Sequence, residues 1–177
     1  MNQKEKSKFL SLILRHQPEL IGLQLDINGW ADVDTLLSLA AARGKRITRQ
    51  ELENIVAESD KQRFAFNDDR SKIRANQGHS IQVDLELPVT TPPEFLFHGT
   101  TGAFVADILK TGIKKMSRQH VHLSVDKATA TKVGSRRGIP LILTIRSGDM
   151  YRDGFPFFVS ANGVWLTDHV PPQYISQ

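Results

Sequence analysis

A proline-rich segment near the middle of the chain constrains the fold more than any other feature. Residues Leu87–Glu94 read Leu-Pro-Val-Thr-Thr-Pro-Pro-Glu. Proline has a fixed φ and no backbone N–H, so this segment suits neither a helix interior nor a central strand. The sequence before it is mainly helical in pattern, and the sequence after it is rich in strand-like runs. We therefore predict an α+β protein with two lobes, residues 1–87 and 95–177, joined by a linker over residues 88–94.

Size and composition narrow the class of protein. The chain has 177 residues, enough for two small cores, and it contains no cysteine, which excludes disulfides and thiolate metal sites. No apolar run approaches the ~20 residues that span a bilayer, and no signal-peptide pattern follows the N-terminal charges. We expect a cytoplasmic protein. The net charge of +4 favours a polyanionic partner, although many proteins carry such a charge for solubility alone.

The first lobe is expected to contain three helices, a short strand and a hairpin. Apolar residues in Glu5–Arg15 recur at helical spacing, and Pro18 ends that helix. Caps, turns and alternation predict the other elements: a strand at Leu23–Asp26, a helix from Asp32 to Gly44, a helix opened by the capping box Thr48–Glu51, and a hairpin of Arg63–Phe66 with Lys72–Ala75. This order is typical of a winged helix, a module that commonly docks on nucleic acid, although fold alone does not establish function.

The second lobe is expected to open with a strand that runs into a helix. Phe95–His98 is typical of a short buried strand, and Gly99 is expected to turn the backbone sharply. Thr100 or Thr101 would then cap a helix over Ala103–Thr111. Such a junction places an imidazole, hydroxyls and unpaired N–H groups near one point, which suits the ribose or phosphates of a nucleotide. From residues 95–102 alone, a tight turn around a packed histidine is the simpler interpretation.

The rest of the second lobe is expected to be mostly β. Strands are predicted at Val121–Ser124, Pro140–Ile145, Phe155–Val159 and Gly163–Leu166, with one more helix over 126–133. This pattern indicates a compact domain with two helices.

Four cationic positions could serve an anionic ligand. Arg15 and His16 end the first helix, where the partial negative charge of the helix end explains them equally well. Arg63 opens the hairpin, and Arg118 precedes the strand that carries His122. Each arginine alone is more simply a surface charge. Together they suit a phosphate, because a guanidinium binds phosphate oxygens two at a time and lysine does not.

A polar loop and several absences complete the inventory. Around Gly78, which allows close backbone approach, the sequence places the polar side chains of Asn76, Gln77, His79 and Ser80. This loop is explained equally well as an irregular connection and as a functional loop.

The sequence lacks the common catalytic motifs: cysteine nucleophiles, Gly-x-Ser-x-Gly elbows, His-Glu-x-x-His helices, P-loops and dinucleotide fingerprints. His98, His120 and His122 have no acidic or cysteine ligand at a zinc-binding spacing, so we expect no metal.

Six short motifs occur along the chain in one order: Leu14-Arg15-His16, Arg63-Phe64, Ile73–Ser80, Phe97–Thr100, Val121–Ser124 and Asn162–Trp165. Each is weak alone, but the ordered set is specific and extends over nearly the whole chain. It resembles the RNA 2′-phosphotransferases of the KptA type. The resemblance implies an N-terminal winged-helix lobe that binds RNA and a C-terminal ADP-ribosyltransferase-like lobe that binds NAD.

The resemblance also implies residue roles. The catalytic quartet of the family falls on Arg15, His16, Arg63 and Arg118. The implied NAD-binding positions are His98, Gly99, Thr100, Thr101, His122, Leu123, Ser124 and Val164. The expected RNA contacts are Arg74, Gln77, His79 and Ser80. His122 stands where many relatives have tyrosine, and Val164 stands where toxin-like relatives have a catalytic glutamate.

The implied activity is the NAD-dependent removal of an internal 2′-phosphate from RNA, typically at a tRNA splice junction. The phosphate displaces nicotinamide from NAD, and the 2″-hydroxyl of the resulting ADP-ribosylated RNA then attacks phosphorus, releasing ADP-ribose 1″,2″-cyclic phosphate. NAD is thus a co-substrate, and neither a membrane nor a protein partner is implied. Two alternatives stay open: an ADP-ribosyltransferase that caps phosphorylated nucleic-acid ends, and a non-enzymatic winged-helix protein that binds nucleic acid.

Overall fold

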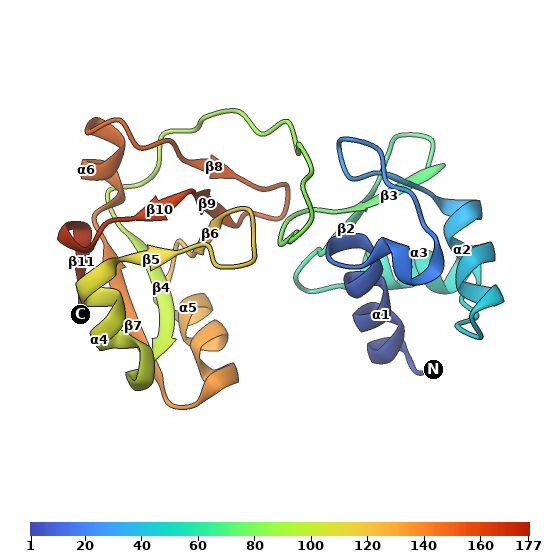
Figure 1. The fold of residues 1–177 in the computed structure, drawn as a ribbon, viewed down its shortest axis with the longest axis horizontal. Helices are drawn as coiled ribbons and strands as arrows, with labels where there is room; N and C mark the ends of the chain where they lie inside the picture. Colours follow the sequence, from blue (N-terminus) through green and yellow to red (C-terminus); the bar gives the residue numbers. More distant parts are fainter. The chain divides into compact units, whose positions relative to one another are not determined.

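The computed structural model describes every residue from Met1 to Gln177 and divides the chain into two compact units, Met1–Glu86 and Leu87–Gln177 (Figure 1). Both units combine helices with small antiparallel sheets, which is an α+β arrangement as expected. Each unit has a separate apolar core. No helix is long and apolar enough to cross a membrane.

The helices of the first unit begin where local capping chemistry predicts. Helix α1 (Gln3–Arg15) starts with a capping box between Asn2 and Glu5. Asp32 accepts a hydrogen bond from the Thr35 backbone and caps α2 (Val33–Ala42). The predicted Thr48–Glu51 box is present at the start of α3 (Arg49–Glu58). These caps satisfy backbone N–H groups that a helix start leaves without partners. The predicted starts of α2 and α3 are confirmed, whereas α1 begins at Gln3, two residues before the predicted start at Glu5.

The predicted hairpin of the first unit is confirmed, but its third strand lies elsewhere. Strands β2 (Phe64–Phe66) and β3 (Lys72–Ala75) pair antiparallel, and β1 (Ala31–Asp32) pairs with the other edge of β3. The predicted strand at Leu23–Asp26 is wrong, since this segment pairs with no strand. Its alternating leucines do pack on the core, which explains the strand-like pattern. The carboxylate of Asp26 instead accepts two backbone hydrogen bonds and forms a turn. A 3₁₀ turn, η1 (Pro18–Ile21), precedes it.

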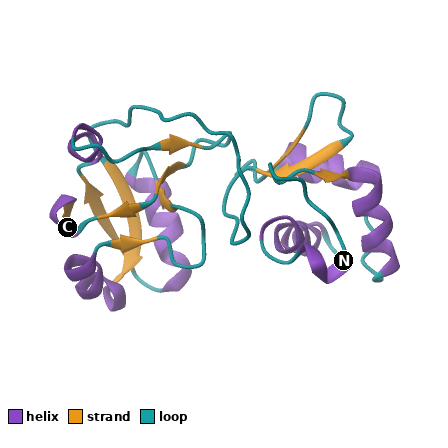
Figure 2. Ribbon diagram, turned by 45° about the horizontal axis from the view of Figure 1, so that its top comes forward, coloured by secondary structure: helices purple, strands orange, loops and turns teal.

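The second unit contains two three-stranded sheets and one separate strand pair (Figure 2). The first sheet has the order β11-β7-β4, with β4 (Leu96–Thr101), β7 (Pro140–Ile145) and β11 (Ile175–Ser176). The second has the order β6-β9-β8, with β6 (Val121–Leu123), β8 (Phe158–Val159) and β9 (Trp165–Thr167). The pair consists of β5 (Ile113–Lys114) and β10 (His169–Val170). Two backbone hydrogen bonds between Phe97 and Ser124 join β4 to the end of β6.

Three helices belong to this unit, one more than predicted. Helices α4 (Gly102–Thr111) and α5 (Lys127–Gly134) follow the prediction closely, and Asp126 caps α5. The short α6 (Ser147–Arg152) was not predicted. Two 3₁₀ turns, η2 (Ser135–Arg137) and η3 (Pro172–Tyr174), complete the unit.

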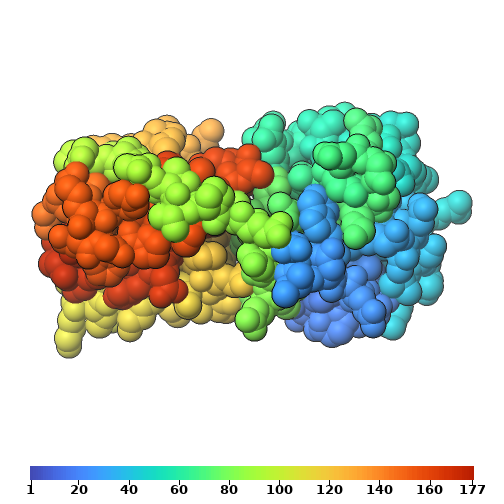
Figure 3. All heavy atoms as spheres, turned by 90° about the horizontal axis from the view of Figure 1, so that it is seen from above, coloured from blue at the N-terminus to red at the C-terminus, as the bar shows by residue number.

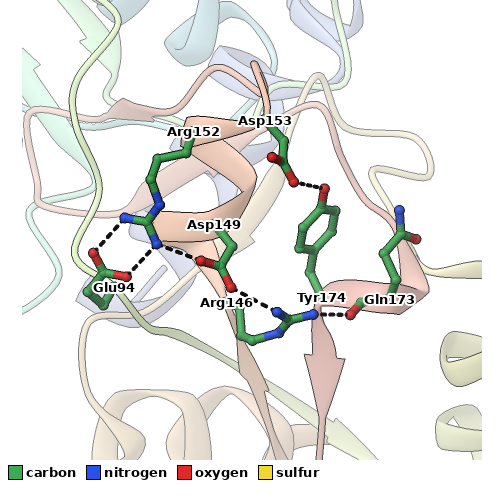
Figure 4. Close-up of polar contacts among 7 residues, drawn as sticks. All are labelled: Glu94, Arg146, Asp149, Arg152, Asp153, Gln173 and Tyr174. Atoms are coloured by element: carbon green, nitrogen blue, oxygen red, sulfur yellow. Dashed lines mark hydrogen bonds and ion pairs between the residues drawn. The ribbon is translucent and has the colours of Figure 1, made fainter.

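An ionic network explains why so polar a segment as α6 is helical (Figure 4). Arg152 binds both carboxylate oxygens of Glu94, at 2.8 and 2.9 Å, and also pairs with Asp149. Arg146 pairs with Asp149 and donates to the Gln173 carbonyl. Exposed ion pairs contribute little one by one, but this network connects the start of the unit, α6 and the C-terminal segment. In the space-filling view α6 and the C-terminal segment lie side by side (Figure 3).

The expected turn at Gly99 is wrong, because β4 continues through this residue as far as Thr101. A Cβ at Gly99 would lie 1.8 Å from the carbonyl oxygen of Ala130 in α5. A Cβ at Gly134 would lie 3.0 Å from the Thr100 carbonyl oxygen. The backbones of α5 and β4 are therefore in direct contact, and glycine is required there by the close approach. The predicted threonine cap is confirmed in position, since Thr101 is the N-cap residue of α4, but its side chain makes no capping hydrogen bond.

Replacing Gly99 by alanine should therefore destabilise the second unit. We expect Gly99→Ala to lower the free energy of unfolding by about 3 kcal/mol or more, because the new methyl group meets a backbone oxygen that cannot move aside without shifting α5. Gly102→Ala is the matched control, since its Cβ would meet only Leu141 Cδ1, at 3.9 Å. Thermal and urea unfolding of both variants measures the difference. Equal stabilities for the two variants would contradict the close contact.

Candidate functional site

The end of α1 holds the first group of candidate residues. Arg15 is the last residue of α1, and His16 is its C-cap. The backbone N–H of Ser80 donates to the Arg15 carbonyl at 2.9 Å, and Ser80 Oγ lies 2.8 Å from His16 Nδ1. Gly78, with φ +89°, faces the Arg15 guanidinium, whose Cζ lies 3.5 Å from the position of a Cβ. The polar loop predicted from the sequence therefore contacts both members of the Arg15–His16 pair.

His79 lies in the same loop but is buried. Its exposed fraction is 1%, and neither ring nitrogen has a hydrogen-bond partner within the chain. The imidazole packs against Gly29, where a Cβ would lie 3.5 Å from Nε2. Burial lowers the pKa of His79 to about 4, and the positive charges of Arg15, His16 and Arg74 act in the same direction. The ring is consequently neutral near neutral pH.

Arg63 and Arg74 flank the loop in different ways. Arg63 directly precedes β2 and is half-buried, and its carbonyl accepts from the Asn76 backbone at 2.9 Å. The guanidinium of Arg74 stacks on the ring of Trp30, 4.4 Å from the ring centroid, and donates to the Asn28 carbonyl at 3.3 Å. Burial lowers the pKa of Arg74. Arg74 thus serves the structure of its own unit through a cation–π contact.

Gln77 completes this loop and is half-buried. Arg15, His16, Gln77, His79 and Ser80 are therefore gathered at one end of α1, with Arg63 tied to the loop through its backbone.

The second unit brings together His98, His122 and Arg118. His98 lies on β4, and its Nδ1 is 3.3 Å from the His122 carbonyl oxygen on β6. Because a carbonyl only accepts, Nδ1 of His98 carries the proton. Burial lowers the pKa of His98, against the effect of this hydrogen bond. Nη1 of Arg118 lies 3.3 Å from Nδ1 of His122. A guanidinium only donates, so that nitrogen of His122 is the acceptor.

Two arginines that the sequence analysis did not single out lie near Arg118. Partial removal of the guanidinium from water lowers the pKa of Arg118, and the charges of Arg137 and Arg136 lower it further. No carboxylate forms an ion pair with any of the three. Both extra arginines belong to η2, which packs beside β4: a Cβ at Gly138 would lie 3.6 Å from Thr101 Cγ2. The Arg-Arg pair directly after α5 is the sequence signal that could have found them.

The other predicted NAD-binding positions have mixed surroundings. Thr100 and Thr101 are buried at the end of β4, and Ser124 pairs with Phe97 through its backbone. The side chain of Leu123 belongs to the apolar core, so a ligand could reach only its backbone. Val164 lies in the turn between β8 and β9, where its backbone N–H donates to Ser160 Oγ at 3.1 Å.

Nowhere in the chain do three His, Asp or Glu side chains come together in a way that could hold a metal ion.

The arginines at positions 118, 136 and 137 form no ion pair with a carboxylate, and guanidinium groups of this kind suit a phosphorylated ligand. Comparison with known proteins is more specific. The family described as RNA 2′-phosphotransferase, Tpt1 / KptA family, matches residues 1–169. The chain therefore belongs to this family, which confirms the resemblance seen in its motifs.

Curated relatives named probable RNA 2′-phosphotransferase resemble the chain over nearly its whole length. The protein from Flavobacterium johnsoniae is 62% identical over 172 residues, which cover 97% of this chain and 94% of the relative. The relative from Burkholderia pseudomallei is 56% identical over 96% of this chain and 92% of its own length. The relative from Hahella chejuensis is 57% identical, with 98% and 93% covered.

The burial of His79 should make the stability of the first unit depend on pH. The folded ring resists protonation down to about pH 4, whereas an unfolded histidine binds a proton near pH 6.5. Stability is therefore undiminished above about pH 6.5 and falls as the pH drops towards 4.

A His79→Gln variant lacks this titration. Between about pH 7 and pH 5, the wild-type protein should lose about 2 kcal/mol more unfolding free energy than the variant. Urea unfolding of both proteins, the one with His79 and the His79→Gln variant, measures these free energies. Both carry Trp165→Phe, so that the fluorescence of Trp30 reports on the first unit alone. Parallel pH profiles would contradict the assignment of a neutral, buried His79.

Proposed function

We propose that this protein is an NAD-dependent RNA 2′-phosphotransferase. It transfers an internal RNA 2′-phosphate, of the tRNA splice-junction type, to NAD through an ADP-ribosylated RNA, and releases nicotinamide and ADP-ribose 1″,2″-cyclic phosphate. The observation that carries the proposal is the family match, which extends over both units. In this proposal the first unit is a winged-helix lobe that binds RNA, and the second is an ADP-ribosyltransferase-like lobe that binds NAD.

The groups of the second unit suit the binding of NAD. His98 is a neutral imidazole whose orientation is fixed by the hydrogen bond from Nδ1 to the His122 carbonyl. Its Nε2 can therefore accept a hydrogen bond from a sugar hydroxyl. Arg118 supplies positive charge beside His122. Once bound, NAD supplies an anomeric carbon from which nicotinamide leaves and a 2″-hydroxyl for the second step.

The protein's own residues act by placement and charge. An RNA 2′-phosphate is already ionised at neutral pH and needs no base to become a nucleophile, which agrees with valine at position 164. Alignment of bound reactants can lower the barrier by roughly 7–11 kcal/mol. Arg15, Arg63 and Arg118 bind the phosphate oxygens and stabilise charge at phosphorus, and loss of one comparable donor costs about 3–4 kcal/mol. His16 donates a hydrogen bond or a proton in the second step.

Product analysis tests this function directly. The protein is incubated with NAD and an oligonucleotide that carries one internal 2′-phosphate, and the products are identified by mass. We expect nicotinamide, ADP-ribose 1″,2″-cyclic phosphate and RNA with a free 2′-hydroxyl. A stable ADP-ribosylated oligonucleotide would favour a capping ADP-ribosyltransferase instead. Binding of the oligonucleotide without any release of nicotinamide would favour the non-enzymatic alternative.

The role of Arg63 predicts the effect of a charge-conserving change. Arg63→Lys keeps the positive charge but loses the two parallel N–H donors, so single-turnover dephosphorylation should slow by about 10- to 100-fold. Arg46→Lys, at an exposed arginine of the same unit, is the matched control and should leave the rate unchanged. If both variants reacted as fast as the wild-type protein, Arg63 would not bind the phosphate through two oxygens.

A further inference from the structure

Ser80 is bonded to both members of the Arg15–His16 pair. Its backbone N–H donates to the Arg15 carbonyl at 2.9 Å, and its hydroxyl lies 2.8 Å from Nδ1 of His16. The first contact fixes the position of Ser80 relative to the end of α1. The second contact then restricts rotation of the His16 ring, because a hydrogen bond on Nδ1 favours one orientation of the imidazole.

The loop around Ser80 is well held, so the hydroxyl is offered at a fixed place. Asn76 is buried, with its backbone bonded to the Arg63 carbonyl and its side-chain amide bonded to the Gln62 carbonyl. His79, at 1% exposure, anchors the loop from inside. Gly78 lets the chain pass against the Arg15 side chain. Ser80 itself is exposed, so its side chain makes no contribution to the core.

The partner of His16 Nδ1 is a hydroxyl, and this determines in which protonation states the hydrogen bond can form. A carbonyl or carboxylate only accepts, and would keep the proton of a neutral imidazole on Nδ1. A hydroxyl both donates and accepts, so it can bond to Nδ1 in either tautomer of the neutral ring and also accept from Nδ1 of the protonated ring. The Ser80–His16 hydrogen bond is consequently retained in both protonation states. A histidine that gives up a proton during a reaction keeps its orientation with such a partner.

We propose that Ser80 is a positioning residue for His16, and that its hydroxyl donates to Nδ1 of the neutral imidazole, so that the ring proton lies on Nε2. The catalytic part of this inference rests on the proposed function, in which His16 donates to the phosphate. With Nδ1 bonded to Ser80, that donation falls to Nε2. The inference gives Ser80 a role through His16, in place of the direct RNA contact expected from the sequence.

The position of the proton on His16 can be measured without any substrate. The ring ¹⁵N shifts of His16, assigned by comparison with a His16→Gln variant, distinguish Nδ1–H from Nε2–H. We expect the Nε2–H form in the wild-type protein and in Ser80→Thr, which keeps the hydroxyl. Ser80→Ala should give a mixture of both forms, and Ser80→Asp should shift the ring to Nδ1–H. Ser38→Ala, at an exposed helical serine of the same unit, is the control and should match the wild-type spectrum.

Single-turnover kinetics with NAD and the 2′-phosphorylated oligonucleotide provide the second readout. Ser80→Ala should slow the reaction at saturating substrate by about 10-fold, as expected for one misplaced catalytic group, with little change in the KM for the oligonucleotide. Ser80→Thr should restore the rate. A raised KM with an unchanged ring spectrum would overturn the inference and make Ser80 an RNA contact. An unchanged spectrum in both Ala and Asp variants would also overturn it.

The two proposals fail in different ways. If the wild-type protein releases no nicotinamide, the proposed function fails, while the ring spectra still decide whether Ser80 sets the form of His16. If the wild-type protein is active but the Ser80→Ala spectrum and rate both match it, the positioning role fails alone.

Discussion

The site of the first unit depends on how α1 ends. The last carbonyl groups of a helix have no partner within the helix and must find one elsewhere. Here the Arg15 carbonyl accepts from the backbone N–H groups of Ser80 and Ile81, at 2.9 and 3.4 Å. Satisfying this helix end therefore brings a loop that is far away in sequence into contact with Arg15 and His16. The hydrogen bonds that satisfy the Arg15 carbonyl thus also hold the candidate catalytic groups together.

Charge is the second constraint on both units. In the first, burial and then the nearby charge of Arg15 lower the pKa of His79 to about 4, so the neutral ring adds no further positive charge beside Arg15. In the second, Arg118 lies near Arg136 and Arg137 without a carboxylate partner. Like charges gathered in this way destabilise a folded protein, and a multiply anionic ligand relieves their repulsion. Structural ion pairs are kept elsewhere, as in the Glu94–Arg152 network of α6. The arginines near Arg118 thus form no ion pairs, unlike those of α6, and this difference supports a phosphorylated substrate.

Local chemistry made part of the fold predictable. Asp32 and the Thr48–Glu51 box act within one helical turn, so their roles could be predicted from the sequence. The strand expected at Leu23–Asp26 depends on a partner that only the tertiary fold could have supplied. For the site, the ordered motifs supplied the candidate residues. They could not indicate the Ser80–His16 contact, since it joins residues 64 positions apart. The arginines of η2 were missed for a similar reason, because their neighbour Arg118 precedes a different strand.

Gly99 shows why a motif residue must be assigned by its contacts. It lies between His98 and Thr100, so a role in binding a ligand is the natural interpretation of the motif. The structure gives it a packing role: α5 lies so close to β4 that a methyl group at Gly99 would overlap the Ala130 carbonyl. That close approach has a consequence for the site, because η2 follows directly on α5 and so places Arg136 and Arg137 beside the end of β4. The close packing at Gly99 thus helps to set where two cations lie. The backbone contact with α5 is by itself enough to require glycine at this position.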